Sequence, residues 1–324
     1  MKHLSLALLA LLLAFLAAIT LFIGKFELNL SEYAAIFSAD HSVAKVVLLD
    51  IRFPRIAAAV LIGAALSVSG AAYQAMLINP LVSPSILGVL SGAGFGAALA
   101  MILGLSIVQM QMLTFVMGIA AVVIAFMLSL ISRAQPLLML ILGGVISSAI
   151  FGALLSVLKY FADPYDTLPN IVYFLMGSLS FATKSAVLAV GGVMLVCIVL
   201  LILLGKQLNA LSLGEDESKS LGINTQKLKI SVVILATLAS SLSVVLGGII
   251  GWIGLIAPHI CRFLFGADNR FVLSASALVG AIFLLICDTL SRQLYSYEIP
   301  IGIITSLFGI PIFIAVLFSV KGTV

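Results

Sequence analysis

LSLALLALLLAFLAAITLFI, residues 4–23, carries no charged side chain and is long enough to cross a lipid bilayer as a helix. A helix needs about 20 apolar residues to span the hydrocarbon core. The basic start Lys2-His3 would also suit a secretory signal peptide, but the apolar core of such a peptide is only about 7 to 15 residues long and ends at a small-residue cleavage site. No such site precedes Lys25, the first charge after the run. The stretch is therefore predicted to be a retained first transmembrane helix.

The composition of the whole chain points to lipid as its main solvent. Of 324 residues, 63% are hydrophobic and 9% are charged, whereas soluble domains carry about 25% charged residues. A chain of this length holds at most about a dozen crossings and leaves little for a soluble domain. We therefore predict one all-α integral membrane domain over residues 1–324. The 16 Lys and Arg residues are scattered, so nucleic acid is not an expected partner.

Charges and turn residues divide the apolar sequence into ten candidate spans. They cover residues 4–24, 56–77, 86–105, 110–131, 137–159, 185–205, 229–247, 251–265, 271–291 and 303–320. The eighth is short for a full crossing, and Gly247-Gly248 is the only interruption before it. The sequence thus predicts about ten transmembrane helices, of which the eighth is the weakest.

The distribution of charge predicts the orientation of the chain. With the N-terminus inside the cell, the cytoplasmic connections hold nine cations and four anions, a net charge of +5, and the outer connections hold seven cations and eight anions, a net charge of −1. Lys and Arg accumulate on the cytoplasmic side of membrane proteins, so both termini are predicted to be cytoplasmic. The count includes Arg133 and Lys321 on the inner side and Glu27, Glu32 and Asp40 on the outer side.

Two connections are patterned rather than plain turns. The outer connection 163–183 contains an apolar stretch that starts at Pro169, as a short interfacial or re-entrant helix would. The cytoplasmic connection 206–229 is the most polar part of the chain, and its segment 213–222 suits a small helix with carboxylates at the N-terminal end and a glycine stop. It is either a solvated loop helix or a docking surface with Leu213, Leu221 and Ile223 as its apolar side chains.

No motif of a known catalytic site occurs in the sequence. GxxxxGK[ST], GxSxG and HExxH are absent, and no span holds a pair of carboxylates. The three cysteines Cys197, Cys261 and Cys287 lie far apart, without a metal-binding spacing. We therefore expect neither enzymatic activity nor a metal site nor a cofactor bound by this chain.

An ion-coupled secondary transporter and a membrane-embedded enzyme are two classes of membrane protein against which the sequence can be tested. An ion-coupled secondary transporter usually has a charged residue near the centre of a span; the predicted spans have none, although backbone carbonyls can also coordinate an ion. A membrane-embedded enzyme needs acids or histidines clustered near one interface. His259 and Asp288 are the nearest candidates, but they are predicted on opposite sides, and His259 is interpreted as structural.

Small residues and interruptions recur inside the apolar segments. Residues 63–72 and 91–98 are rich in Gly, Ala and Ser, which let helices pack closely in lipid. Proline and glycine interrupt the apolar sequence at 79–84, 257–259 and 300–311. Irregular backbone at membrane depth is tolerated only where protein buries it or where it lines a cavity, so we expect functional breaks at these three places.

Several long motifs follow one another along the chain. They are Asp50-Ile-Arg-Phe-Pro-Arg55, Asn79-Pro80-Leu81, Leu213-Gly-Glu-Asp-Glu-Ser-Lys-Ser-Leu-Gly222, Gly251-Trp-Ile-Gly-Leu-Ile-Ala-Pro-His259 with Arg262, Glu298-Ile-Pro-Ile-Gly302 and Gly309-Ile-Pro311. In this order they resemble the permeases of ABC importers for iron-siderophores, haem and cobalamin, the FecCD-type transmembrane subunits. The resemblance covers nearly the whole chain and implies a type II ABC importer permease-like bundle in a bacterial or archaeal inner membrane.

The resemblance also implies partners and site residues. The partners would be a second permease copy in a homodimer, ATPase subunits that hold ATP and magnesium, and a periplasmic or lipid-anchored substrate-binding protein. Residues 206–228 match the family's ATPase-coupling loop, with the site residues Leu213, Gly214, Glu215, Asp216, Glu217, Ser218, Leu221 and Gly222. Arg52, Arg55 and Arg292 match outer arginines that meet acidic residues of the binding protein, although anchoring at the membrane interface would also explain them. Asn79 and Leu81 match the cytoplasmic gate.

The transported molecule stays open at this point. Iron chelates, haem and cobalamin are the cargo that the resemblance implies, while some relatives move molybdate or tungstate. Spans poor in polar groups suit a wide, weakly binding passage for a large chelate. The implied function is ATP-driven, binding-protein-dependent import, with ion-coupled transport as the alternative.

Overall fold

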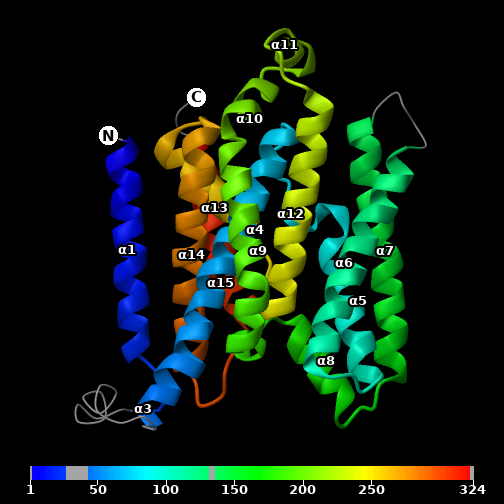
Figure 1. Ribbon diagram of the computed structural model, residues 1–324, viewed down its shortest axis with the longest axis vertical. Coiled ribbons are helices and arrows are strands. Elements are labelled where there is room, and N and C mark those ends of the chain that lie inside the picture. Colours follow the sequence, from blue (N-terminus) through cyan, green and yellow to red (C-terminus); the bar gives the residue numbers. More distant parts are fainter. Residues whose placement is uncertain (1, 27–42, 131–135, 322–324) are drawn as a thin grey trace.

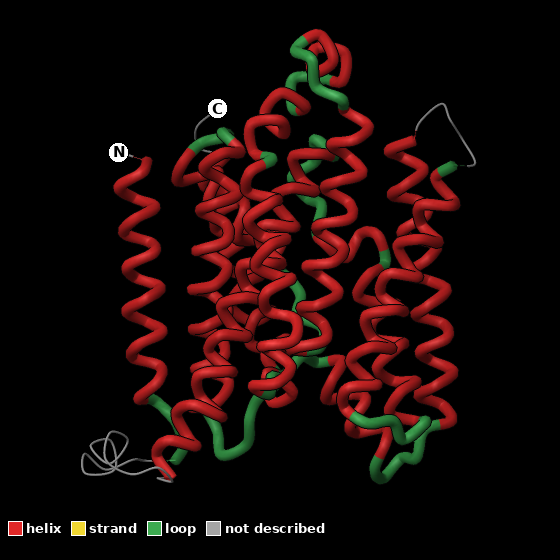
Figure 2. Tube along the Cα trace, in the orientation of Figure 1, coloured by secondary structure: helices red, strands yellow, loops and turns green. Residues whose placement is uncertain are grey.

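The computed structural model describes residues 2–26, 43–130 and 136–321, and all regular structure in these ranges is helical (Figures 1 and 2). The longer helices are α1 (Lys2–Phe22), α4 (Phe53–Met76), α5 (Val89–Ile102), α6 (Ile107–Ser129), α7 (Pro136–Phe161), α9 (Lys184–Leu203), α12 (Thr225–Gly247), α13 (Ile253–Phe265), α14 (Asn269–Gln293) and α15 (Ile301–Lys321). The shorter ones are α3 (Val43–Lys45), η1 (Val46–Arg52), η2 (Pro84–Leu87), α8 (Thr167–Leu175), η3 (Leu179–Phe181), α10 (Gly205–Leu211) and α11 (Glu215–Ser220). Each predicted span coincides with one of the longer helices.

Length separates these helices into two classes. Seven described segments are long and apolar enough to cross a membrane, namely Lys2–Phe22, Val43–Met76, Ile107–Ser129, Leu138–Phe161, Lys184–Leu203, Thr225–Gly247 and Asn269–Gln293. Three further apolar helices are shorter, namely Val89–Ile102, Ile253–Phe265 and Ile301–Val316. Helix α5, for example, is about 21 Å long at about 1.5 Å per residue, against about 30 Å of hydrocarbon. Seven crossings therefore follow from length, and the other three remain predictions.

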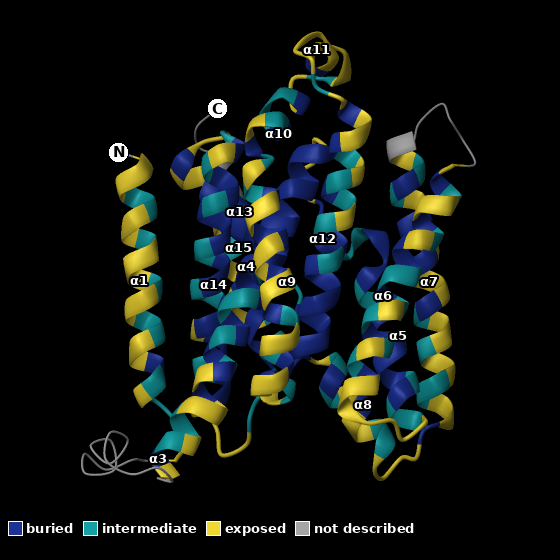
Figure 3. Cartoon of the chain, viewed as in Figure 1, coloured by how far each residue is buried: buried dark blue, intermediate teal, exposed yellow. Residues whose placement is uncertain are grey.

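Helix α4 is the centre of the larger of two helix groups. It packs against α9, α12, α13 and α14. In the apolar segment Val43–Met76, of which α4 is the main part, 83% of the most apolar stretch is buried. By contrast, only 6% of the most apolar stretch of α1 is buried, and Figure 3 shows this difference between α4 and α1. A methyl group on Gly63 would overlap the carbonyl of Gly280 in α14, so small residues are what allow this approach. The close packing predicted for residues 63–72 is confirmed.

A second group consists of α5, α6 and α7, which pack against one another. This group stands to the right in Figure 1 and meets the first group mainly through α12, which contacts both α5 and α6. Helix α12 is therefore the element that joins the two halves of the bundle.

The breaks predicted at proline are partly wrong. The chain leaves the helix after α4, where Ile78 has a φ of +49°, but Pro258 and Pro311 lie inside α13 and α15. Pro258 cannot donate to the carbonyl of Gly254 one turn earlier. That carbonyl instead lies against Gly70 of α4, where any Cβ would overlap it. Packing by a neighbouring helix thus accommodates the proline, as is common in membrane helices.

Irregular backbone does occur where three connections meet. The Ser178 amide donates to the Gly247 carbonyl, and the Ile301 amide donates to the Gly177 carbonyl, both at 2.9 Å. The connections after α8, after α12 and before α15 therefore satisfy each other's backbone groups. Helix α8 itself is the short helix that the sequence predicts near Pro169.

The bundle has two distinct ends. Both termini and α11 lie at one end, called here the α11 end, while α3 and the α7–α8 and α14–α15 connections lie at the other, called the α3 end (Figure 1). Of the residues in the charge count, Glu27, Glu32, Asp40, Arg133 and the side chain of Lys321 lie outside the described residues.

Candidate functional site

Helix α11 projects from the α11 end between α10 and α12 (Figure 1). Gly214 precedes it with a φ of +127°, and Gly222 follows it with a φ of +80°. Both values lie in a region that residues with a Cβ seldom adopt, so glycine sets where the helix begins and ends. Glu215, Asp216 and Glu217 form its first turn, where carboxylates interact favourably with the helix dipole.

One side of α11 is fixed and the other is open. Ser218 is fully buried, and its hydroxyl donates to a backbone carbonyl at the start of the helix at 2.7 Å. Lys229 of α12 forms an ion pair with Glu215. Leu213 and Leu221 are exposed. The residues predicted for coupling thus form one protruding element that offers apolar and acidic side chains to a partner.

A polar cluster ties α10 to the start of α14. Asn209 donates to the Asp268 carboxylate at 2.6 Å and accepts from the Asn269 amide at 2.7 Å. Arg270 forms an ion pair with Asp268 at 2.7 Å. The hydrogen bonds from Arg270, the hydrogen bond from Asn209 and the charge of Arg270 hold the pKa of Asp268 well below its usual value, despite some desolvation. This cluster anchors the segment that carries α11 to the rest of the bundle.

The predicted gate residues lie in an exposed turn after α4. The Asn79 side chain accepts from the Leu81 amide at 3.0 Å, a local bond that favours a turn. Asn79 and Leu81 are both exposed, so neither forms a constriction within one copy of the chain.

Gln74 and Arg262 hold this turn, and sequence reasoning did not single out Gln74. The buried Gln74 side chain donates to the Val82 carbonyl at 3.0 Å and accepts a hydrogen bond from Arg262 of α13. Its signal in the sequence is a lone amide within the small, apolar end of α4. The pair connects the gate turn to α13.

Arg52, Arg55 and Arg292 lie together at the α3 end, where Arg52 and Arg292 are buried and the Arg55 side chain is 11% exposed, so they do not form an open rim. Arg55 Nε lies 2.8 Å from one Asp288 oxygen, and its two terminal nitrogens bind Glu298 at 2.9 and 3.0 Å. Arg292 Nε lies 3.1 Å from the other Asp288 oxygen. The resemblance grouped the three arginines by their expected docking role, which stays a prediction, and the sequence did not single out the two carboxylates that pair two of them.

Arg52 connects this cluster to α1. It donates to the carbonyls of Leu21 and Phe26 at 2.7 and 2.6 Å. Helical backbone runs from η1 into α4 without a gap, so the helix begins before Pro54, which is the condition for Arg52 and Arg55 to share a face.

The cluster carries more positive than negative charge. It joins three guanidinium groups with two carboxylates, and Nη2 of Arg292 is buried without a hydrogen-bond partner among the described residues. Burial opposes ionisation of Glu298, but the hydrogen bonds and charge of Arg55, aided by the Ser180 hydroxyl, lower its pKa below the usual value. The arrangement keeps the Glu298 carboxylate charged and leaves the five groups of the cluster with a net charge of +1.

The sequence of this chain is similar to those of known membrane transport proteins. The model of the FecCD transport family matches residues 11–319. The molybdate import permease MolB of Haemophilus influenzae is 38% identical over 97% of this chain and 95% of that protein. The vitamin B12 import permease BtuC of Vibrio vulnificus is 37% identical over 95% of this chain and 92% of that protein.

A solved structure agrees with these relatives. A metal-chelate type ABC transporter in an inward-facing conformation superposes with a TM-score of 0.89 at 38% identity and covers 97% of this chain and 98% of its own. Fold and sequence agree with these proteins over almost the full length of the chain. This chain belongs to the FecCD transport family of ABC importer permeases.

Proposed function

We propose that this chain forms the membrane passage of a binding-protein-dependent ABC importer for an iron chelate, such as a ferric siderophore or haem, or for cobalamin. Molybdate is the other candidate cargo, because a molybdate permease is among the relatives that align over the whole chain. The observation that carries the proposal is the family match over residues 11–319 together with a protruding α11. ATP drives import from separate subunits, so this chain binds neither ATP nor magnesium itself.

The proposed assembly has a fixed polarity. Two copies of this chain form a homodimer with the passage between them, ATPase subunits bind at the α11 end, and a periplasmic or lipid-anchored binding protein docks at the α3 end. The α11 end, with both termini, faces the cytoplasm of a bacterium or archaeon. All 324 residues form one permease domain, and α5, α13 and α15 complete about ten crossings.

Three groups of residues carry the proposed roles. Residues 213–222 fit a cleft of the ATPase and transmit its closure. Asn79 and Leu81 from both copies narrow the passage at its cytoplasmic side. The unmatched positive charge of Arg52, Arg55 and Arg292 attracts acidic residues of the binding protein, and such complementarity mainly raises the association rate and fixes register.

Uptake into proteoliposomes tests the proposal. Vesicles contain the permease and its co-purified ATPase, and ferric siderophore, haem, cobalamin and molybdate are each offered with their own binding protein. We expect uptake of one of these substrates. The uptake should require ATP on the side of the membrane that α11 faces. Uptake driven by an ion gradient without a binding protein would overturn the proposal in favour of a secondary transporter.

A further inference from the structure

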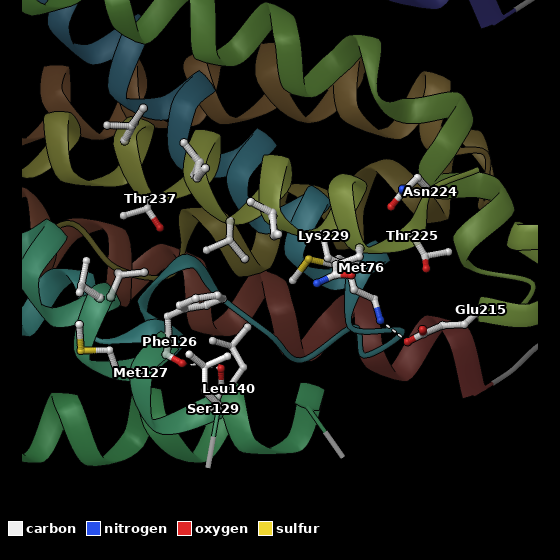
Figure 4. A pocket seen from close by; sticks show the side chains of 18 of the residues that line it. Met76, Phe126, Met127, Ser129, Leu140, Glu215, Asn224, Thr225, Lys229 and Thr237 are labelled. Atoms are coloured by element: carbon white, nitrogen blue, oxygen red, sulfur yellow. Dashed lines mark hydrogen bonds and ion pairs between the residues drawn. The ribbon is translucent and has the colours of Figure 1, made fainter. Parts of the chain in front are cut away.

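A groove opens between α6 and α12 beside α11, at the seam between the two helix groups (Figure 4). Its volume is about 1270 Å³. Apolar side chains of the two helices form its walls, namely Val123, Phe126 and Met127 of α6 and Ile230, Val233 and Ile234 of α12. Glu215, Lys219 and Gly222 of the coupling segment line one end of the groove, whereas its apolar walls serve none of the coupling, gate or docking roles above.

The position of the groove decides what can fill it. Helices α6 and α12 are both long and apolar enough to cross the membrane, so these walls lie at bilayer depth. Water gains no hydrogen bonds from an apolar wall. The exposed side chains of Met127 and Ile234 must therefore be covered by lipid chains or by another protein.

The end of the groove beside α11 is polar. Glu215, Lys219 and Lys229 line it, with a net charge of +1, and Asn224 and Gln226 lie beside them. Lys229 pairs with Glu215. Within the described part of the chain, Lys219 forms an ion pair with the exposed Asp216 at 3.2 Å, and such surface pairs are weak and easily exchanged.

We propose that this groove binds an anionic phospholipid from the leaflet on the α11 side. One acyl chain lies between α6 and α12, and the phosphate meets the ammonium groups of Lys219 and Lys229. Basic pockets between transmembrane helices on the cytoplasmic side are suited to lipid headgroups. An apolar wall that ends in cations fits an amphiphile, whereas free phosphate would leave the wall uncovered. The bound lipid braces α11 against α6 across the seam.

Native mass spectrometry of the purified full-length chain tests this site without requiring transport. Phosphatidylglycerol and phosphatidylcholine with the same acyl chains are titrated onto the protein. The headgroup variant is Lys219→Gln, and its control is Lys184→Gln, because both lysines are 57% exposed and each pairs with one aspartate. The chain variant is Ile234→Trp, and its control is Leu195→Trp on α9, since these residues are 52% and 54% exposed.

We expect wild type to bind phosphatidylglycerol more tightly than phosphatidylcholine. Lys219→Gln should weaken the former about fivefold, the effect of one cation beside an anionic lipid, and leave the latter unchanged. Ile234→Trp should weaken both lipids, while the two controls should bind like wild type. Equal binding by all variants would overturn the proposal, because the lipid would then be annular. Loss of the lipid when the ATPase assembles would also overturn it and assign the groove to that subunit.

Discussion

Asp288 holds two arginines at once, one oxygen bound to Arg55 and the other to Arg292. It is fully buried, and removal of one partner from a buried ion pair typically costs about 3–5 kcal/mol, since a charge is left uncompensated. We therefore expect Asp288→Asn to lower the free energy of unfolding by about that amount, seen as a lower melting temperature in detergent.

An exposed ion pair at the same end supplies the control. Asp50 lies 2.7 Å from Lys184, and both side chains are about half exposed. Asp50→Asn should change stability by no more than about 1 kcal/mol. Equal melting temperatures for the two variants would mean that the buried cluster does not stabilise the fold.

Asp268 makes stability at the α11 end depend on pH. Its pKa is held below the usual value of about 3.9 by Arg270 and Asn209. A depressed pKa in the folded state adds stability that is fully present above the unfolded pKa and is lost as the pH falls towards the folded value. Wild type should thus melt above Asp268→Asn at pH 7, and the difference should shrink below about pH 4. A difference that stays unchanged when the pH falls well below about 4 would assign the effect to helix capping instead of charge.

At the scale of single elements, α11 protrudes from one end of the bundle (Figure 1). The double variant Glu215→Lys and Glu217→Lys reverses the charge at the helix N-terminus, where cations are unfavourable, and breaks the ion pair with Lys229. We expect the loaded binding protein to lose its stimulation of ATP hydrolysis, while membrane insertion stays normal. Lys2→Glu, a charge reversal on exposed α1 at the same end, should keep the stimulation. Normal coupling in the double variant would remove these residues from the coupling site.

Helix packing gives a matched pair of glycines. A methyl group on Gly63 of α4 would meet the backbone of Gly280, which cannot rotate away, whereas one on Gly152 of α7 would meet nothing within 4 Å. Gly63→Ala should destabilise the bundle by about 1–3 kcal/mol. Gly152→Ala should be neutral or stabilise it by up to about 1 kcal/mol. Thermal unfolding of both variants separates packing from helix propensity, and equal shifts would contradict the packing account.

At the scale of the whole molecule, the sequence predicted helices far better than contacts. Apolar length, divided by charges and turn residues, placed the ten longer helices, seven of which are long enough to cross a bilayer. The acidic start with a closing glycine located α11. The break expected at Pro258 is absent, because the carbonyl that this proline leaves without a backbone donor packs against Gly70 in another helix. The ion cluster was missed for the same reason: Arg55 and its partners Asp288 and Glu298 are 233 and 243 residues apart. No local pattern encodes such a distance.

The orientation of the bundle is testable with two single cysteines. Leu213 before α11 is 68% exposed, and Tyr165 in the α7–α8 connection at the opposite end is 94% exposed. The three native cysteines are buried, so they should give little background. A membrane-impermeant maleimide added to spheroplasts should label Tyr165→Cys and leave Leu213→Cys unlabelled until the membrane is permeabilised. This result follows from the excess of Lys and Arg at the connections on the α11 end. The reverse labelling would place α11 outside the cell, where no ATP-hydrolysing subunit could reach it, and the import direction would lose its physical basis.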